Sequence, residues 1–162
     1  MSSDIPTNSL FSLVSRGELP MPAAATLLGL KVEHAERGSV DLSFRADGSF
    51  LNAAGSVQGG MLSAMLDEAL SLSMLTILDR GEYLATLEMK VQFISAAQAG
   101  ALRARGRLIH RGRRIGFVEG DLRQGERLVA KATATVSIQG SARQPAVTQD
   151  ARASQPLDAN DR

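Results

Sequence analysis

The sequence contains no cysteine and no tryptophan, and only 4% of its residues are aromatic. The absence of cysteine excludes disulfide bonds, thiolate catalysis and zinc sites built from cysteine. Only two histidines are present, His34 and His110, and neither belongs to an HExxH motif, so we expect no bound metal. The glycine motifs that cradle nucleotide phosphates and the GxSxG motif of serine hydrolases are also missing.

An excess of charge of one sign is missing too. The 18 Lys and Arg residues and 17 Asp and Glu residues leave a formal net charge of +1, which argues against non-specific binding of nucleic acid. The most apolar stretch is interrupted by Asp67, Glu68 and Asp79, so no run of about 18 uncharged apolar residues exists. The N-terminus does not read as a signal peptide. We therefore expect a cytoplasmic protein without nucleic-acid or membrane partners.

The 162 residues, 44% of them hydrophobic, are enough for one domain with a sizeable core. Segment 1–27 predicts two short helices, the first with Asn8 as its N-cap and the second ending at Gly29. The segment 140–162 is rich in Gln, Ala, Ser and Asp and predicts a disordered tail. The main domain is therefore expected over 28–139.

Alternating apolar and polar residues predict that most of this domain is sheet. Residues 30–46 read as two strands around a turn at 37–39, followed by a glycine-rich loop over 47–56. Turn signals at Gly100, Gly112 and Gly125 separate four further strands, and their short connections favour an antiparallel meander. These four strands are expected over 82–95, 101–111, 114–123 and 127–138.

The segment between the loop and the later strands predicts one long helix over about 58–78. Its apolar residues leave no broad polar face, and such a helix is buried on several sides. A sheet that curls around the helix can cover it in this way. The sequence therefore predicts an α+β fold in which a curved antiparallel sheet wraps around a long central helix.

The start of this helix, in the stretch "SVQGGMLSAMLDEAL", contains the glycine pair Gly59 and Gly60. The first amides of a helix lack partners within the helix and carry the positive end of its dipole. Because glycine has no Cβ, a ligand can approach the backbone there, and such an end suits an anion or a developing oxyanion. Tight packing of the helix against a strand explains the pair equally well.

Two adjacent acids lie in the same helix. Helical spacing places Asp67 on one face with Ser63 and Ser71, whereas Glu68 lies about 100° further round. Only one acid can serve a site on the serine face, and Asp67 is our candidate. The alternatives for Asp67 are a buried acid satisfied by hydroxyl groups or an ion pair across a subunit interface. For Glu68 we expect a structural partner, such as an arginine.

Gly59 and Asp67 are eight residues apart, which corresponds to about 12 Å along a helix axis. One small carbonyl group cannot touch both. If both act on one substrate, the second group must come from another subunit whose helix runs antiparallel beside the first. A two-fold dimer would then hold two identical sites.

Basic residues are concentrated in the second half of the chain. Arg103, Arg105 and Arg107 alternate and therefore line one face of a strand. Arginine suits bidentate contacts to phosphate, although a solvated sheet face explains any one of these residues. Half of the Lys and Arg residues lie in this region: Arg103, Arg105, Arg107, Arg111, Arg113, Arg114, Arg123, Arg127 and Lys131.

The segments "LNAAGSVQGGMLSAMLDEA", "TLEMKVQFISAAQAG" and "GRRIGFVEGDLRQGERLVAKATAT" occur in an order that resembles the PaaI-like acyl-CoA thioesterases of the hotdog-fold superfamily. The resemblance runs from about Leu28 to Ile138. It implies a hotdog fold, an acyl-CoA substrate, no cofactor, and a homo-oligomer that is a dimer or a pair of dimers forming a homotetramer.

The resemblance also implies a set of site residues. Asn52, Gly59 and Gly60 would lie near the thioester carbonyl, which the Gly59 amide would polarise. Asp67 of the partner subunit would be the base or the nucleophile. The remaining positions implied are Thr86 to orient water, Ser71 as a polar neighbour, and Arg113 and Arg114 for the phosphates of coenzyme A. Separately, the apolar and adaptable side chains of Leu51, Met61, Met65 and Leu66 are expected to line the acyl pocket, which is compatible with an aromatic or medium-chain acyl group.

One residue departs from the family pattern. The histidine that precedes the glycine pair in the family is Gln58 here, and an amide can donate a hydrogen bond but cannot act as a general acid near neutral pH. A positional role for this residue would preserve thioester hydrolysis. The departure is also the main support for the competing interpretation, a non-catalytic acyl-CoA-binding or sensor protein. A hydratase fits least, because neither histidine lies in the glycine turn.

Overall fold

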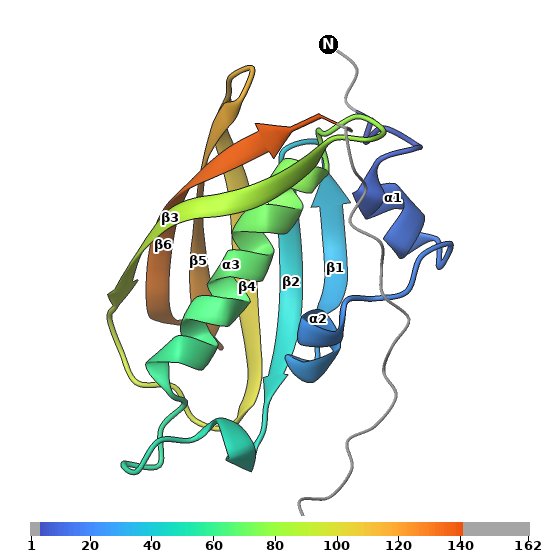
Figure 1. Cartoon of the computed structure of the whole chain (residues 1–162). Coiled ribbons are helices and arrows are strands. Elements are labelled where there is room, and N and C mark those ends of the chain that lie inside the picture. Colours follow the sequence, from blue (N-terminus) through green and yellow to red (C-terminus); the bar gives the residue numbers. More distant parts are fainter. Residues whose placement is uncertain (1–3, 141–162) are drawn as a thin grey trace, which may run out of the picture.

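A computed structural model describes residues 4–140 of the chain (Figure 1). Six antiparallel strands form one sheet in the order β1-β2-β4-β5-β6-β3. The strands are β1 Lys31–Glu36, β2 Ser39–Ala46, β3 Tyr83–Phe93, β4 Gly100–Arg111, β5 Ile115–Gln124 and β6 Arg127–Gln139. The helices are α1 Leu10–Ser15, α2 Ala23–Leu27 and α3 Gly59–Leu75, with a 3-10 turn η1 Gly48–Phe50.

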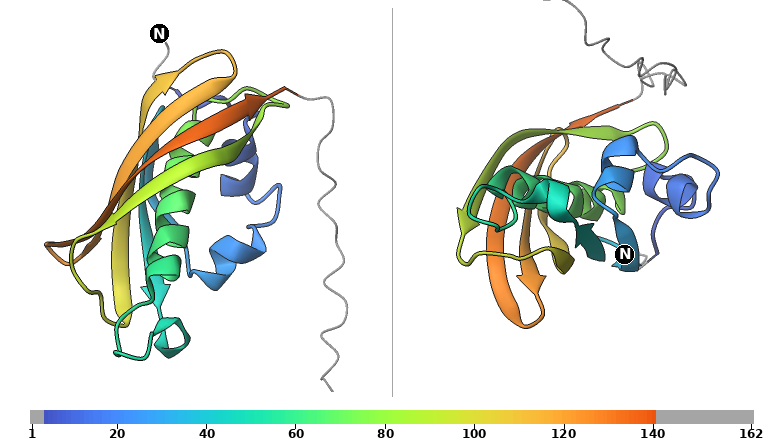
Figure 2. Two further views of the ribbon diagram at one scale, coloured as in Figure 1. Left: turned by 60° about the vertical axis from the view of Figure 1, so that its left-hand side comes forward. Right: turned by 90° about the horizontal axis from the view of Figure 1, so that it is seen from below.

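Alternating burial turns one face of the sheet toward a shared core. In β2, Val40, Leu42 and Phe44 are buried, and in β4 the buried positions alternate with exposed Arg103, Arg105 and Arg107 as predicted. Viewed from below, the sheet curves around α3, while α1 and α2 lie beside α3 near β1 (Figure 2). The predicted curved antiparallel sheet around a central helix is confirmed.

Helix α3 supplies the centre of this core. Met65, Leu66, Ala69, Leu70 and Met74 are each completely buried. Leu62 is only 3% exposed. Burying a large apolar side chain stabilises the fold by roughly 1.5–3 kcal/mol, so this face of α3 is a major part of the folding free energy.

The helix ends three residues earlier than predicted, at Leu75. The reason is the buried hydroxyl of Thr76, which donates to the carbonyl of Ser73 at 2.7 Å and accepts from the Gly38 amide at 2.7 Å. This contact joins the end of α3 to the turn between β1 and β2. Ile77 and Leu78 remain buried in the segment that follows.

Two further predictions are wrong in detail. The first helix is capped by Ser9, whose hydroxyl accepts from the Ser12 amide at 3.1 Å, and not by Asn8. The last four strands are not one meander, because β3 pairs with β6 and lies at the edge of the sheet. The short connection from β3 to β4 instead passes the start of α3, where the Ala97 carbonyl accepts from the Val57 amide at 2.8 Å.

The tail predicted over 140–162 lies almost wholly outside the described residues.

The close approach of β4 to α3 depends on Gly106. A Cβ at this position would overlap the Ala69 carbonyl in the backbone of α3, which cannot rotate away. We expect Gly106→Ala to lower the free energy of unfolding by about 1–3 kcal/mol or more, as overpacked cores do. Urea denaturation measures this loss. Gly48→Ala is the matched control because a Cβ there meets no atom within 4 Å, and an equal effect of both changes would contradict the packing role of Gly106.

Candidate active site

The start of α3 is organised by Gln58, the residue that departs from the family pattern. Gln58 is the N-cap of the helix, and its side-chain oxygen accepts hydrogen bonds from the Gly60 amide at 2.5 Å and the Met61 amide at 3.3 Å. A side-chain oxygen at this position satisfies amides that the helix leaves unpaired. Gln58 therefore has a structural use here that requires no proton transfer.

Gly59 is the first residue of α3, and its amide is left free by this capping. Among residues 4–140, no acceptor contacts the Gly59 N–H. A Cβ added to Gly59 would lie 3.2 Å from the ring of Phe93, at the end of β3. Phe93 is 55% exposed, so its ring lies beside the free amide and also faces solvent. The sequence pattern gave no signal for this aromatic neighbour, because it comes from a strand distant in the chain.

Asp67 lies in the middle of α3 and is held by β3. The Thr86 hydroxyl donates a hydrogen bond to Asp67 Oδ1 at 2.9 Å. The register of β3 against β6 shifts between Thr86 and Glu88, and such a bulge redirects side chains along a strand. The second carboxylate oxygen of Asp67 has no hydrogen-bond donor among the described residues. The structure thus brings together two residues that the resemblance placed in one site.

Other predicted site residues lie on the same side of α3 or in the loop before it. Ser71 is half-buried one turn beyond Asp67, and Ser63 donates to the Gly59 carbonyl at 2.9 Å. Asn52 Oδ1 accepts from the amides of Ala54 at 2.9 Å and Ser56 at 3.2 Å. The side-chain oxygen of Asn52 therefore shapes the loop that leads to α3.

The structure also confirms that Gly59 and Asp67 belong to one uninterrupted helix. Eight residues of helix separate them by about 12 Å along the axis. The two groups of one chain therefore cannot contact the same carbonyl group, as the sequence spacing predicted.

The expected acyl pocket is only partly consistent with the structure. Met61 and Leu51 are half-buried near the start of α3. Met65 and Leu66 are completely buried in the core and cannot contact a substrate without a rearrangement. That part of the pocket prediction is wrong, because helical periodicity does not reveal how far the sheet curls around the helix.

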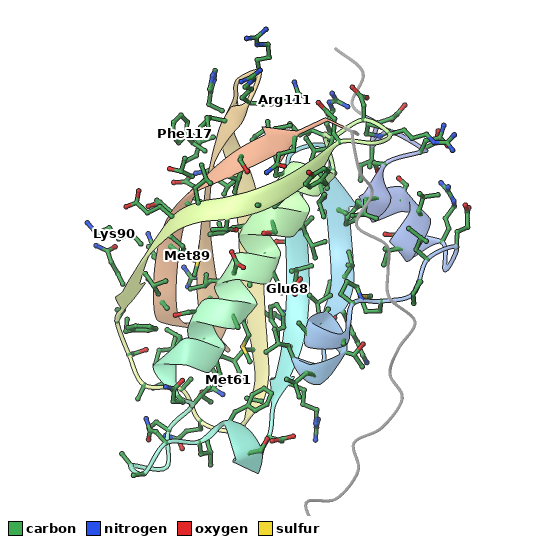
Figure 3. All side chains as sticks on the ribbon, in the orientation of Figure 1. Met61, Glu68, Met89, Lys90, Arg111 and Phe117 are labelled. Carbon is green, nitrogen blue, oxygen red and sulfur yellow. The ribbon has the colours of Figure 1, made fainter. Side chains whose placement is uncertain are left out.

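A cavity of about 830 Å³ lies elsewhere along α3, between this helix, α1, α2 and β1. Its walls are mostly apolar, and Glu68, Glu33 and His34 also line it. Glu68 is labelled on the side of α3 that faces β1 (Figure 3). The sequence signalled the apolar residues of this segment but not that the N-terminal helices would leave a cavity beside α3.

The expected arginine partner of Glu68 is absent from residues 4–140: no ion pair there involves Glu68. Burial, and secondarily the neighbouring Asp67 carboxylate, raise the pKa of Glu68 above its ordinary value of 4.5. Glu33 and His34 of β1 are the other titratable groups in the shared cavity. The ionised form of Glu68 therefore lowers the stability of the folded state.

This cost predicts a pH-dependent effect of Glu68→Gln. A carboxyl group with a raised pKa binds its proton more tightly in the folded state, so its contribution to stability is present below about pH 4.5 and is lost as the pH rises through the raised pKa. Glu68→Gln should therefore raise Tm at pH 7.5 and lose this advantage at pH 4.5, with each kcal/mol worth roughly 2–4 °C. Thermal melts across this range measure the difference. Exposed Glu36→Gln controls for the lost charge, and a difference in Tm that did not depend on pH would contradict the account.

The structure divides the arginines into paired and free groups. Arg107 pairs with Glu119, Arg111 with Glu82 at 2.7 Å, and Arg123 with Asp121 at 3.3 Å. Arg113 and Arg114, in the turn between β4 and β5, are exposed and have no acidic partner within the described part of the chain. Arg113 and Arg114 are therefore open to an anionic ligand, as are the exposed Arg103, Arg127 and Lys131 of the neighbouring strands, which also have no acidic partner among the described residues.

Within residues 4–140, no helix has the length and apolarity that crossing a bilayer requires.

Comparisons with known proteins agree with this architecture. The family model of the thioesterase superfamily matches residues 54–131. A Pseudomonas aeruginosa protein described as an esterase is 30% identical over 93 residues, which are 57% of this chain and 69% of that protein.

Solved structures give the same result. A Ralstonia eutropha protein described as a thioesterase related to phenylacetic acid degradation is 43% identical, with a TM-score of 0.77, over 78% of this chain and 98% of that chain. A Streptococcus pneumoniae thioesterase protein solved with coenzyme A is 25% identical, with a TM-score of 0.67, over 73% of this chain and 93% of that chain.

The curved sheet around a central helix, the half-buried carboxylate midway along that helix and the family match together identify a hotdog-fold thioester hydrolase. The chain belongs to the thioesterase superfamily and to its PaaI-like branch.

Proposed function

We propose that this enzyme hydrolyses acyl-CoA thioesters, with an aromatic or medium-chain acyl group, at sites shared between two subunits. Asp67 of one subunit is the base or nucleophile, and the Gly59 amide of the other is the oxyanion donor. The observation that carries the proposal is the arrangement of Asp67. One carboxylate oxygen is fixed by Thr86 at 2.9 Å, and the other has no partner among residues 4–140.

The chemistry needs Asp67 near the carbonyl carbon of the thioester and the Gly59 amide near its carbonyl oxygen. With Asp67 as base, its free oxygen takes a proton from water while the water oxygen attacks the thioester carbon. The Gly59 amide stabilises the resulting oxyanion, whose collapse breaks the C–S bond and releases the free acid and the CoA thiol after protonation of sulfur. With Asp67 as nucleophile, its carboxylate oxygen attacks the thioester carbon and the C–S bond breaks, which leaves an acyl anhydride on Asp67 and releases CoA as the thiolate. Water then hydrolyses the anhydride to the free acid and restores the carboxylate, and the thiolate takes up a proton.

The edge position of β3 supports a shared site. A long edge strand with exposed backbone groups pairs readily with a second chain. Pairing of β3 with its copy across a two-fold axis would lay the two α3 helices side by side in opposite directions, because Asp67 and Thr86 already join α3 to β3. The Gly59 end of one helix would then lie beside the second half of the other. Whether two such dimers form a tetramer stays a prediction, as does the cytoplasmic location.

The positions of Arg113 and Arg114 support coenzyme A as the leaving group. Their turn lies at the end of the molecule where α3 ends (Figure 1), and Gly116, which follows it, packs against Met74. In an antiparallel pair this is also where the partner's Gly59 would lie. A related thioesterase protein was solved with coenzyme A, and exposed arginines without acidic partners suit its phosphates.

Gln58 supports the same activity through its position. Its side-chain oxygen caps α3. Its amide NH₂ group donates to no acceptor among the described residues and is therefore available to a ligand. This NH₂ group could donate to the thioester oxygen beside the Gly59 amide. Asn52 and Gly60 shape the same end of the helix, and Ser71 and Met61 lie along the proposed substrate path.

The direct test is thiol release from a panel of acyl-CoAs, measured with a thiol-reactive chromophore. The panel should include benzoyl-CoA, phenylacetyl-CoA and straight-chain acyl-CoAs from C2 to C16. We expect turnover with at least one aromatic or medium-chain member. Binding of acyl-CoAs without thiol release, measured by calorimetry under the same conditions, would contradict hydrolysis of this substrate class.

A further inference from the structure

We infer that the cavity between α3, α1, α2 and β1 holds the acyl chain of the substrate, and that it selects apolar chains without an anionic end. This inference rests on the proposed function. The cavity measures about 830 Å³, within the 300–1,000 Å³ range of small-molecule sites. Its apolar walls include Phe11, Val14, Met21, Val32, Leu72 and Leu75.

The cavity is next to the proposed reacting group. Glu68, which lines the cavity, directly follows Asp67 in α3, so the two side chains are separated by about 100° around the helix and about 1.5 Å along it. The helix surface between them carries Ala64 and Ser71, neither of which is large enough to block a chain. An acyl group whose carbonyl lies at Asp67 can therefore cross this short surface and enter the cavity.

The charges around the cavity limit what its occupant can be. Glu68 and Glu33 both line it, and none of its lining residues is a lysine or arginine. A second carboxylate at the far end of the acyl chain would meet two acids and no lysine or arginine, with His34 as the one basic side chain of the lining. This is unfavourable in a partly desolvated site. Methyl-terminated chains meet no such penalty, and a hydroxyl end can donate to either carboxylate.

The expected signature is a dependence of turnover on chain length. Each methylene that enters the cavity should raise kcat/KM by up to about fourfold, the equivalent of about 0.8 kcal/mol for a buried CH₂. We therefore expect kcat/KM to rise from hexanoyl-CoA to dodecanoyl-CoA. A dodecanoyl chain with a terminal carboxylate should be at least about tenfold poorer than its methyl-terminated counterpart.

Variants that fill the cavity test this assignment. Val32→Trp, on the edge strand β1 where Val32 is 38% exposed, and Leu72→Trp on α3 both place a large ring into the cavity. Both should lower kcat/KM for dodecanoyl-CoA at least about tenfold while changing that for hexanoyl-CoA less than about threefold. Leu27→Trp is the matched control, because Leu27 is 66% exposed on α2 and does not line the cavity.

The outcomes separate this inference from the proposed function. If thioester hydrolysis is present but the cavity variants affect short and long chains equally, the cavity assignment is overturned and the proposed function stands. If no acyl-CoA is hydrolysed, the proposed function fails, and calorimetric binding of dodecanoyl-CoA then tests the cavity alone. Binding that Val32→Trp weakens would support the assignment, and binding that it leaves unchanged, or no binding, would overturn it.

Discussion

Asp67→Asn is expected to lower kcat/KM for the best acyl-CoA substrate by about 10²–10⁴-fold, the range associated with loss of a positioned base. The amide keeps the size of the side chain, and its oxygen can still accept from the Thr86 hydroxyl, which now lies 2.9 Å from Asp67 Oδ1. It cannot accept a proton or attack a carbonyl carbon. The fold and substrate binding should therefore survive while turnover is lost.

Thiol-release kinetics and calorimetry with the same acyl-CoA measure the two parts of this prediction. Asp79→Asn is a suitable control, because it removes one negative charge at an exposed position just beyond α3. A variant at Asp67 that kept more than about a third of wild-type kcat/KM would contradict its role. So would a loss of activity that followed unfolding, measured by a matching drop in Tm.

Gly59→Pro is expected to lower kcat by about 10²–10³-fold, as removal of one oxyanion donor does in other enzymes. Proline deletes the N–H of residue 59 and is tolerated at the first position of a helix. The preceding residue is already extended, with φ −64° and ψ 137° at Gln58, the conformation that proline favours in its neighbour. The change therefore removes the donor with little disturbance of the helix.

Gly59→Ala distinguishes the loss of the amide donor from the steric effect of an added Cβ. Alanine adds the same Cβ, which would lie 3.2 Å from the exposed ring of Phe93, but it keeps the N–H. We expect Gly59→Ala to retain most of the turnover that Gly59→Pro loses. Equal losses in kcat for the two variants would indicate that steric fit at residue 59 matters, and not its amide.

The fold was predictable because its two repeating patterns are strong. Alternation fixed the faces of β2 and β4, and the lack of a polar face in α3 required a sheet that curls around it. Strand order was not predictable from connection lengths, since the short link after β3 leads to a strand that β3 does not pair with. Register and order depend on contacts between distant segments, such as Val57 with Ala97, which no local pattern reveals.

The candidate site shows the same division. Helical spacing separated Asp67 from Glu68 and showed that Gly59 could not reach Asp67 within one chain. The resemblance placed Thr86 in the site, to orient water, but the contact of its hydroxyl with Asp67 was not predicted, because it depends on the path of β3, whose register shifts beside Thr86. The free state of Arg113 and Arg114 required the structure, since pairing of their neighbours with Glu119, Glu82 and Asp121 depends on strand register.

The central claim, one site built by two subunits, is tested most directly with hybrid dimers. Asp67→Asn and Gly59→Pro chains carrying different affinity tags can be co-expressed, and the hybrid purified by both tags in turn. Each parent variant should be inactive alone. In the hybrid, one site combines the intact Asp67 of one chain with the intact Gly59 of the other, so we expect about half of the wild-type turnover per dimer. A hybrid as inactive as its parents would contradict the shared site.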